Sequence, residues 1–351
     1  MTQTLKQKIG QLFLVGFEGD KISANQWIAR DIEDNCLGGV ILFDRLLAKN
    51  KSSNNIISAN QLRNLTEKLQ KLAESTLLIA VDQEGGKVNR FKEGRGFITT
   101  PCAAIMGKEQ DHSKTAASAE QTAEMLVSTG INFNLAPVVD LDIYKQNPII
   151  GAYGRSFSPH PQEVTAHAAT WIEEHQKKGV ISCLKHFPGH GSSRHDSHLG
   201  FVDITTTWRE DELYPYRQLI EQGRADSIMV GHLLNRSFDA HYPATLSQKT
   251  IQNIARKKLQ FTGLLISDDM QMKAITDHYG LKDGCCLALA AGMDMLIVGN
   301  NIVHDPEIFV KLRDAVLTAV SRGQLTEQRI DNAWKRVQKL KEKIGKHRKR
   351  L

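Results

Sequence analysis

The feature that most constrains this chain is a regular alternation of short apolar runs with longer amphipathic stretches. Eight runs rich in aliphatic and β-branched residues have the length of buried strands. Their ranges are 11–16, 39–43, 77–82, 132–139, 180–186, 227–232, 264–268 and 293–298. Apolar residues recur at helical spacing between them, over 60–72, 115–128, 161–177, 208–221 and 249–259. Because strands that alternate with helices pair in parallel, the sequence predicts an α/β fold, a single TIM-like (β/α)8 barrel, with a doubly wound open sheet as the alternative.

The chain shows no internal boundary. No linker rich in proline, glycine or serine divides its 351 residues, and no repeat is present beyond the alternation. Hydrophobic residues make up 41% and charged residues 24%, an ordinary globular composition that supports a sizeable core. We therefore expect one domain over residues 1–351.

The positive net charge comes from one segment. Residues 335–350 hold nine lysines and arginines against one glutamate, a local charge of +8, so the rest of the chain carries −2 of the total of +6. Val337, Leu340 and Ile344 lie at helical spacing there, which predicts a basic C-terminal helix or tail at 335–351 that frays into solvent. No nucleic-acid partner is expected, and a membrane-surface or nucleic-acid contact of this segment is the alternative.

Cysteine usage and hydropathy indicate the compartment. The five cysteines form an odd set without a C-x-x-C pair, and Cys285 and Cys286 are adjacent, a pattern typical of a reduced, cytoplasmic protein. No apolar run reaches 18 residues, so no membrane span is expected. No small-residue cleavage site follows the apolar run at 9–15, so no secretion signal is expected either. These patterns leave the oligomeric state open.

Charged, imidazole and amide side chains collect where the predicted strands end. The set comprises Asp82, Glu84, Asp140, Asp142, Lys185, His186, His232, Asp268, Asp269 and Asn300. In a parallel barrel the carboxyl ends of all strands share one rim, and such enzymes build their active sites there. The distribution therefore predicts a polar site at the C-terminal rim.

One loop is rich in histidine and admits two interpretations. His186, His190, His195 and His198 are accompanied by Asp196 and Asp203. This set could be a divalent metal site, but the glycines and proline of 187–191 force a loop and exclude a helical H-x-x-x-H site. A metal-free acid/base site is favoured, because Asp196 lies two residues from His198, where a carboxylate can fix the imidazole tautomer and raise its pKa.

Two further patterns suggest side chains that handle a substrate. Asp268 and Asp269 end the seventh predicted strand, where neighbours point apart, so one can face the barrel axis while the other caps the next turn. An inward carboxylate there could be a nucleophile, a base or a metal ligand. Arg90 and Arg155 follow turns and are candidates for holding polar substrate groups or for forming rim salt bridges.

Six sequence words occur in the order typical of one family. They are VDQEGGKV at 81–88, NPIIG at 147–151, GRSF at 154–157, KHFPGHG at 185–191, DSH at 196–198 and SDDMQM at 267–272. With these words the chain resembles, over residues 8–340, bacterial glycoside hydrolase family 3, and within it the β-N-acetylhexosaminidase branch. The most specific signal is KHFPGHG followed at short range by DSH.

The resemblance implies a retaining glycosidase that removes a terminal β-linked N-acetylglucosamine without metal or cofactor. Asp268 matches the family's nucleophile, and His198 matches the acid/base, with Asp196 as its partner. The positions that match the residues holding the sugar are Asp82, Arg90, Arg155, Lys185 and His186. The implied substrates are muropeptides, GlcNAc-1,6-anhydro-MurNAc-peptides released from peptidoglycan, and the implied setting is cell-wall recycling in the cytoplasm.

The sequence departs from the family pattern in the acid/base loop. Ser192-Ser193-Arg194-His195 stand where many relatives have Gly-Asp-Thr, which makes His195 a rival for the acid role. The alternatives within enzymes are a β-glucosidase or a phosphorolytic β-glycosidase, because an imidazole tolerates an incoming phosphate better than a carboxylate does. The alternative outside enzymes is a non-catalytic sugar-binding barrel.

Overall fold

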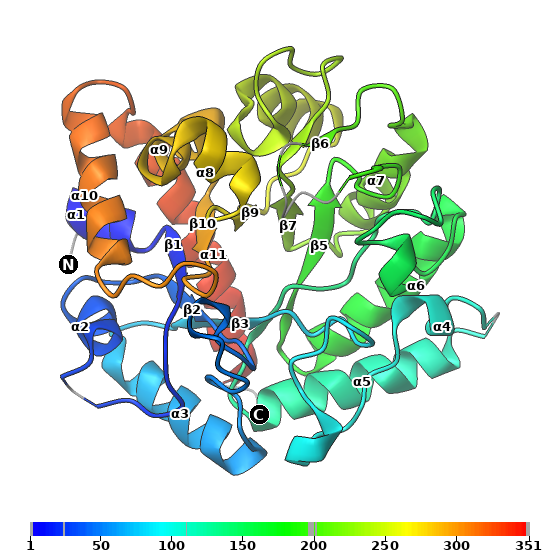
Figure 1. The fold of residues 1–351 in the computed structure, drawn as a ribbon, viewed down its shortest axis with the longest axis horizontal. Helices are drawn as coiled ribbons and strands as arrows, with labels where there is room; N and C mark the ends of the chain where they lie inside the picture. The colour runs from blue at the N-terminus through cyan, green and yellow to red at the C-terminus, as the bar shows by residue number, and fades with distance from the viewer. Residues whose placement is uncertain (1–2, 24, 110, 196–199, 201, 349–351) are drawn as a thin grey trace.

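The computed structural model of the chain describes residues 3–23, 25–109, 111–195, 200 and 202–348. Eight parallel strands form a closed barrel in the order β1-β10-β9-β7-β5-β4-β3-β2 (Figure 1). They are β1 (Phe13–Gly16), β2 (Gly39–Ile41), β3 (Leu78–Val81), β4 (Phe133–Asn134), β5 (Ile181–Phe187), β7 (Ser227–Val230), β9 (Leu264–Asp269) and β10 (Met295–Val298). Each strand falls at a predicted apolar run, and the predicted (β/α)8 barrel is confirmed.

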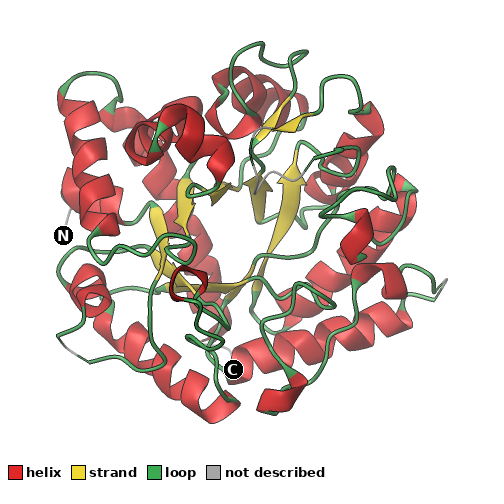
Figure 2. Ribbon diagram, viewed as in Figure 1, coloured by secondary structure: helices red, strands yellow, loops and turns green. Residues whose placement is uncertain are grey.

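Helices surround the barrel on its outer side (Figure 2). They are α1 (Leu5–Gly10), α2 (Trp27–Glu33), α3 (Ala59–Leu72), α4 (Ala103–Met106), α5 (Ser113–Ser128), α6 (Pro161–Lys177), α7 (Tyr214–Glu221), α8 (Lys273–Tyr279), α9 (Leu281–Ala291), α10 (Ile308–Ser321) and α11 (Glu327–Arg348). The strands are covered by helices outside and filled by side chains inside, so every residue of β1, β3, β5, β7 and β10 is buried. This double burial explains why the strands read as continuous apolar runs.

Two predicted helices differ in detail. The segment predicted as one helix over 208–221 is a 3₁₀ turn, η4 (Glu210–Leu213), followed by α7. Pro215 lies in the first turn of α7, where its missing N–H has no intrahelical acceptor to lose, so the α-helix begins only there. The helix predicted over 249–259 is present as a π-helix, η6 (Thr250–Lys258).

A small second sheet lies beside the barrel and was not predicted. It consists of β6 (Val202–Asp203) paired in parallel with β8 (Leu233–Leu234). Val202, Ile204 and Leu233 form a separate apolar cluster beneath it. With two residues each, these strands are too short to show a periodicity in the sequence.

The basic C-terminal segment is a packed helix. Val337, Leu340 and Ile344 of α11 are at most 5% exposed and belong to the main core. Lys341 on the same helix is buried, and its Nζ donates to Gln11 Oε1 at 2.6 Å. The expectation of a solvated end is wrong for this face of α11, because its apolar side chains are covered by the barrel. Within the described residues, no helix is long and apolar enough to cross a membrane.

Candidate active site

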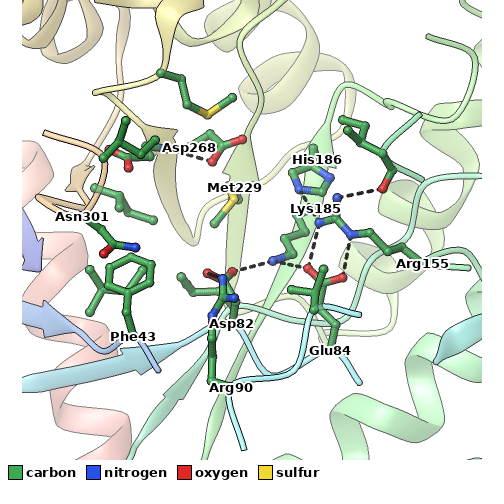
Figure 3. Close-up of a pocket in the computed structure, with 18 of the residues that line it drawn as sticks. Phe43, Asp82, Glu84, Arg90, Arg155, Lys185, His186, Met229, Asp268 and Asn301 are labelled. Carbon is green, nitrogen blue, oxygen red and sulfur yellow. Dashed lines mark hydrogen bonds and ion pairs between the residues drawn. The ribbon is translucent and has the colours of Figure 1, made fainter. Parts of the chain in front are cut away.

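The carboxyl ends of the barrel strands surround a cavity of ≈ 350 Å³. Six side chains singled out in the sequence line it (Figure 3): Asp82, Arg90, Arg155, Lys185, His186 and Asp268. They come from the ends of β3, β5 and β9 and from the loops after β3 and β4. The structure therefore brings together all the predicted site residues that it describes, at the rim where a parallel barrel gathers its strand ends.

A network of ion pairs forms one wall of the cavity. Lys185 is 2% exposed, and its Nζ lies 2.8 Å from Asp82 Oδ1 and 2.7 Å from Glu84 Oε1. Arg155 completes the wall with a bidentate contact, in which Nε and Nη2 each donate to Glu84 at 2.8 Å (Figure 3). Two cations and two carboxylates thus neutralise one another and present fixed polar atoms to the cavity.

The network fixes the charge state of its members. Burial alone would raise the pKa of Asp82, but the positive charges of Lys185 and Arg90 outweigh it and hold that pKa below its usual range. Burial likewise opposes ionisation of Glu84, yet Arg155 and Lys185 lower its pKa. Burial would lower the pKa of Lys185, whereas Asp82 and Glu84 raise it. All these groups are therefore charged near neutral pH.

His186 is held in one orientation. Its Nδ1 lies 2.7 Å from Asp140 Oδ2, and its Nε2 lies 3.2 Å from Arg155 Nη2. Because a guanidinium only donates, Nε2 acts as the acceptor and Nδ1 carries the proton that goes to Asp140. Asp140 also accepts from the backbone N–H of His190 at 2.8 Å, so this buried carboxylate fixes the turn that follows β5.

Arg90 lies beside a second carboxylate. Its Nη2 is 3.4 Å from Asp82 Oδ2, and its Nη1 is 3.9 Å from Asp44 Oδ1. Its guanidinium lies 5.7 Å from the centre of the Phe43 ring, within cation–π range. Arg90 thus joins the ends of β2 and β3 across the cavity wall.

The two aspartates at the end of β9 have different surroundings. Asp268 lines the cavity apart from the ion-pair wall, and its Oδ1 accepts the backbone N–H of Asp269 at 2.8 Å (Figure 3). Asp269 Oδ1 accepts the N–H groups of Gln271 at 3.0 Å and of Gly299 at 2.9 Å. Both aspartates line the cavity, and Asp269 also caps the next turn and ties β9 to the end of β10 through its two backbone hydrogen bonds.

The first part of the histidine-rich loop rests on two buried side chains. Asn147 Nδ2 donates to His190 O at 2.7 Å and to Gly191 O at 3.2 Å. Glu212 Oε2 accepts the N–H of Gly191 at 3.0 Å. A Cβ at residue 191 would lie 1.9 Å from Leu141 O, so only glycine allows this close approach. The loop is therefore anchored firmly up to residue 193.

Comparison with known proteins assigns the chain to a family. The profile of the glycosyl hydrolase family 3 N-terminal domain matches residues 4–340. The chain belongs to this family. A curated β-hexosaminidase from Tolumonas auensis is 34% identical over 313 residues, 86% of this chain and 89% of that protein.

Two solved structures of glycosyl hydrolase family 3 support the assignment. A β-N-acetylglucosaminidase from Paenibacillus sp. FPU-7 superposes with a TM-score of 0.88 at 32% identity and covers 98% of this chain, which spans 63% of the longer Paenibacillus chain. A β-N-acetylhexosaminidase from Beutenbergia cavernae superposes with a TM-score of 0.86 at 27% identity and covers 97% of this chain and 99% of its own. The fold therefore matches the family over almost the whole chain.

Part of the predicted acid/base loop lies outside the described residues. Asp196 and His198 both fall within 196–199, so their predicted roles stay predictions. The rival His195 is described and exposed. Loops deliver catalytic groups in many barrel enzymes, and in the described part of this loop Asn147 Nδ2 donates to Ser193 Oγ at 3.2 Å, three residues before Asp196.

The metal interpretation of the histidine cluster finds no support in the described part of the chain. Over those residues no group of three or more histidine, cysteine, aspartate or glutamate side chains is placed to hold a metal ion. The Nδ1 atoms of His186 and His190 bind Asp140 and Ser193 instead. Asp203 lies in β6, where its Oδ2 is 3.1 Å from Arg236 Nε.

Several residues of the site were given no individual role in the sequence analysis. Five of them line the cavity, and a sixth, Asp140, contacts it through His186; the five are Phe43, Asp44, Glu84, Met229 and Asn301. Glu84 and Asp140 carried a signal, since each follows a predicted strand and a charged group at a barrel rim is expected to act there. Phe43 and Met229 are apolar strand-end residues, and their pattern is the same as that of core residues.

Proposed function

We propose that this protein is a retaining exo-β-N-acetylglucosaminidase, a hydrolase that releases terminal β-linked N-acetylglucosamine. The observation that carries the proposal is the single cavity that joins Asp268 to the Asp82–Lys185–Glu84–Arg155 wall. The wall offers charged donors and acceptors to sugar hydroxyls, while Asp268 offers a nucleophile beside them. The names of the relatives, β-hexosaminidase and β-N-acetylglucosaminidase, support the same activity.

The dimensions of the site favour removal of one sugar at a time. Small-molecule pockets span about 300–1,000 Å³, and the cavity of ≈ 350 Å³ is at the lower end of that range. A cavity of this volume at the carboxyl ends of the strands suits one terminal sugar better than a run of sugars from a polymer, which supports exo action.

The proposed mechanism has two steps. The Asp268 carboxylate attacks the anomeric carbon while His198, as imidazolium, gives its proton to the departing glycosidic oxygen. The bond from carbon to the leaving oxygen breaks and a covalent glycosyl-Asp268 ester forms. Neutral His198 then takes a proton from water, the water oxygen attacks the anomeric carbon, and Asp268 leaves with overall retention of configuration. Asp196 keeps His198 in the required tautomer and raises its basicity.

The ion-pair wall holds the sugar in this mechanism. Asp82, Arg90, Arg155, Lys185 and His186 bind the hydroxyl and acetamido groups of the N-acetylglucosaminyl unit. Because the wall is preorganised by its own ion pairs, it does not rearrange as charge develops at the anomeric carbon. No step requires a metal or an organic cofactor.

We further propose that residues 1–351 act as one catalytic domain in the cytoplasm on GlcNAc-1,6-anhydro-MurNAc-peptides during cell-wall recycling. The free state of all five cysteines is compatible with a reducing compartment. Hydrolysis of this disaccharide-peptide, followed by mass spectrometry of the products, tests the substrate.

A panel of aryl β-glycosides tests the activity itself. The proposal expects the N-acetylglucosaminide to be turned over far faster than the glucoside, at a rate that does not depend on phosphate. Proton NMR should show the β-anomer of N-acetylglucosamine as the first product. A glucoside preference, formation of a sugar 1-phosphate, or binding without turnover would point to the β-glucosidase, the phosphorylase or the sugar-binding barrel.

A further inference from the structure

The cavity contains a buried carboxylate that the proposed mechanism does not use. Asp44 follows β2, is 6% exposed and lines the cavity. Its Oδ1 is buried and has no hydrogen-bond partner among the described residues. A buried carboxylate oxygen is costly to leave without a donor, so its presence at a binding cavity indicates that a ligand supplies one.

The Asp44 segment is held in place by its neighbours. Arg95 Nη1 donates to the backbone carbonyl of Asp44 at 3.1 Å. The preceding residue, Phe43, exchanges hydrogen bonds with Asn55, both at 2.9 Å. Lys92 Nζ lies 3.7 Å from the other carboxylate oxygen, Asp44 Oδ2. The backbone at Asp44 is thus fixed at the cavity wall, and Lys92 contacts its carboxylate.

Arg90 shows the same incomplete pairing. Its Nη1 lies 3.9 Å from Asp44 Oδ1, which is beyond hydrogen-bond length, and its buried Nε has no hydrogen-bond partner among the described residues. On its other side, Nη2 reaches Asp82 Oδ2 at only 3.4 Å. The Asp44 Oδ1 acceptor and the Arg90 Nε donor are therefore both buried without a hydrogen-bond partner among the described residues, on two side chains whose nearest charged atoms lie 3.9 Å apart. A hydroxyl group is both a donor and an acceptor and satisfies such a pair.

We propose that Asp44 is a specificity-determining residue, whose carboxylate accepts a hydrogen bond from one free hydroxyl of the terminal sugar, next to the hydroxyl bound by Asp82. The inference deepens the proposed function and rests on it. A carboxylate accepts only, so the partner must be a donor, and the nearby cations Arg90 and Lys92 already neutralise the charge of Asp44. The partner is accordingly a neutral hydroxyl rather than an ammonium group.

A cycle that combines enzyme variants with deoxy substrates tests this assignment. The substrates are an aryl β-N-acetylglucosaminide and its 3-deoxy, 4-deoxy and 6-deoxy analogues. Asp44→Ala should lower kcat/KM for the parent substrate about 10- to 100-fold, the range for a hydrogen bond to a charged group. For one deoxy analogue, wild type and Asp44→Ala should have the same kcat/KM, because the group that Asp44 binds is already missing. For the other two, the penalties should multiply.

Two variants accompany this cycle. Asp44→Asn keeps the size of the side chain and one acceptor oxygen, so it serves if Asp44→Ala does not fold and should show a smaller loss at the same hydroxyl. Asp142→Asn is the matched control, because Asp142 Oδ1 is also buried without a hydrogen-bond partner among the described residues but does not line the cavity. Any loss in kcat/KM caused by Asp142→Asn should multiply with the loss from each of the three analogues.

The outcomes separate this inference from the proposed function. Suppose that wild type turns over the parent substrate. If the loss in kcat/KM caused by Asp44→Ala multiplies with the loss from every deoxy analogue, or if Asp44→Ala leaves kcat/KM for the parent substrate unchanged, Asp44 binds no hydroxyl and the inference is wrong. If wild type does not turn over the parent substrate, the proposed function fails. In that case the affinities of wild type and Asp44→Ala for free N-acetylglucosamine and its deoxy analogues, measured by calorimetry, test Asp44. For one analogue the two proteins should bind equally well.

Discussion

Lys185 lies between Asp82 and Glu84, with its Nζ 2.8 Å from the first carboxylate and 2.7 Å from the second, and only 2% of the side chain exposed. A buried cation with two carboxylate partners is a site where stability and function depend on the same atoms. Lys185, near the end of β5, thus pairs with Asp82 just after β3, 103 positions earlier in the chain.

Replacing this lysine should therefore cost both stability and activity. Lys185→Met removes the charge but keeps the volume, and it leaves Asp82 beside Glu84 without their shared cation. We expect a loss of about 3–5 kcal/mol in the free energy of unfolding, measured by urea denaturation at neutral pH. Exposed Lys177, paired with Glu174, is the control, and Lys177→Met should cost less than about 1 kcal/mol. Equal losses for the two variants would show that the buried network adds no stability.

The same network predicts a dependence on pH. Because the folded pKa values of Asp82 and Glu84 are lowered, their contribution to stability is present above their unfolded values, near pH 4, and is lost as the pH falls below them. Wild type should lose stability in this acid range more steeply than Lys185→Met, in which both pKa values are closer to normal. Parallel stability curves for the two proteins between pH 5 and pH 2 would refute the electrostatic account.

Glu212, beneath the histidine-rich loop, should change stability with pH in the opposite direction: its contribution falls as the pH rises. Burial and the negative charge of Asp140 raise the pKa of Glu212 to about 7. A folded pKa above the unfolded value of 4.5 means that this contribution is present below pH 4.5 and is lost as the pH rises through about 7, by roughly 3 kcal/mol. Glu212→Gln should abolish this loss in melting curves, while Asp211→Asn on the exposed face of the same turn should keep it. If Glu212→Gln loses as much stability as wild type when the pH rises through about 7, another group is responsible for the loss.

The acid/base assignment is tested through the leaving group. General acid catalysis is worth about 10²–10⁴-fold, and a phenolate that leaves readily hardly needs it. His198→Ala should therefore form the glycosyl-enzyme from an activated aryl substrate but hydrolyse it slowly, giving a burst of phenol in stopped-flow traces. Asp196→Ala should show the same trend more weakly, and His195→Ala should behave almost as wild type. A burst in His195→Ala alone would transfer the role to that histidine.

Removal of metals should leave the reaction unaffected. Acid/base chemistry by an imidazole and a carboxylate needs no Lewis acid, so dialysis against a chelator should not change kcat or KM. Activity that is lost on dialysis and restored by zinc or manganese would instead make the histidine-rich loop a metal site.

The sequence was sufficient for the barrel because its strands are buried on both faces and their apolar runs are unbroken, as in β5. The sequence also placed Lys185, His186 and Asp268 in the site, because each is a polar residue at the end of such an apolar run. It did not pair Glu84 with Arg155, since 71 residues separate them and only the closed barrel brings their loops together. The apolar spacing of Val337, Leu340 and Ile344 was visible in the sequence, but their burial was not expected, because the surrounding lysines and arginines dominate the composition of this segment.

The central claim is that Asp268 is the nucleophile and that Asp269 supports the structure. Asp269→Ala should keep turnover but lose about 1–2 kcal/mol of stability, because it removes the acceptor for Gln271 and Gly299. Asp268→Ala should fold normally and be inactive, since a residue at the rim adds little to the core.

Covalent trapping tests this claim most directly. A 5-fluoro-N-acetylglucosaminyl fluoride carries an activated leaving group and a slowed second step, so the glycosyl-enzyme should accumulate. Peptide mass spectrometry of the labelled protein should place the sugar on Asp268, and Asp268→Ala should remain unlabelled while Asp269→Ala is labelled. A label on Asp269 or on any other residue, or an enzyme that turns the reagent over with inversion and without a label, would contradict the account.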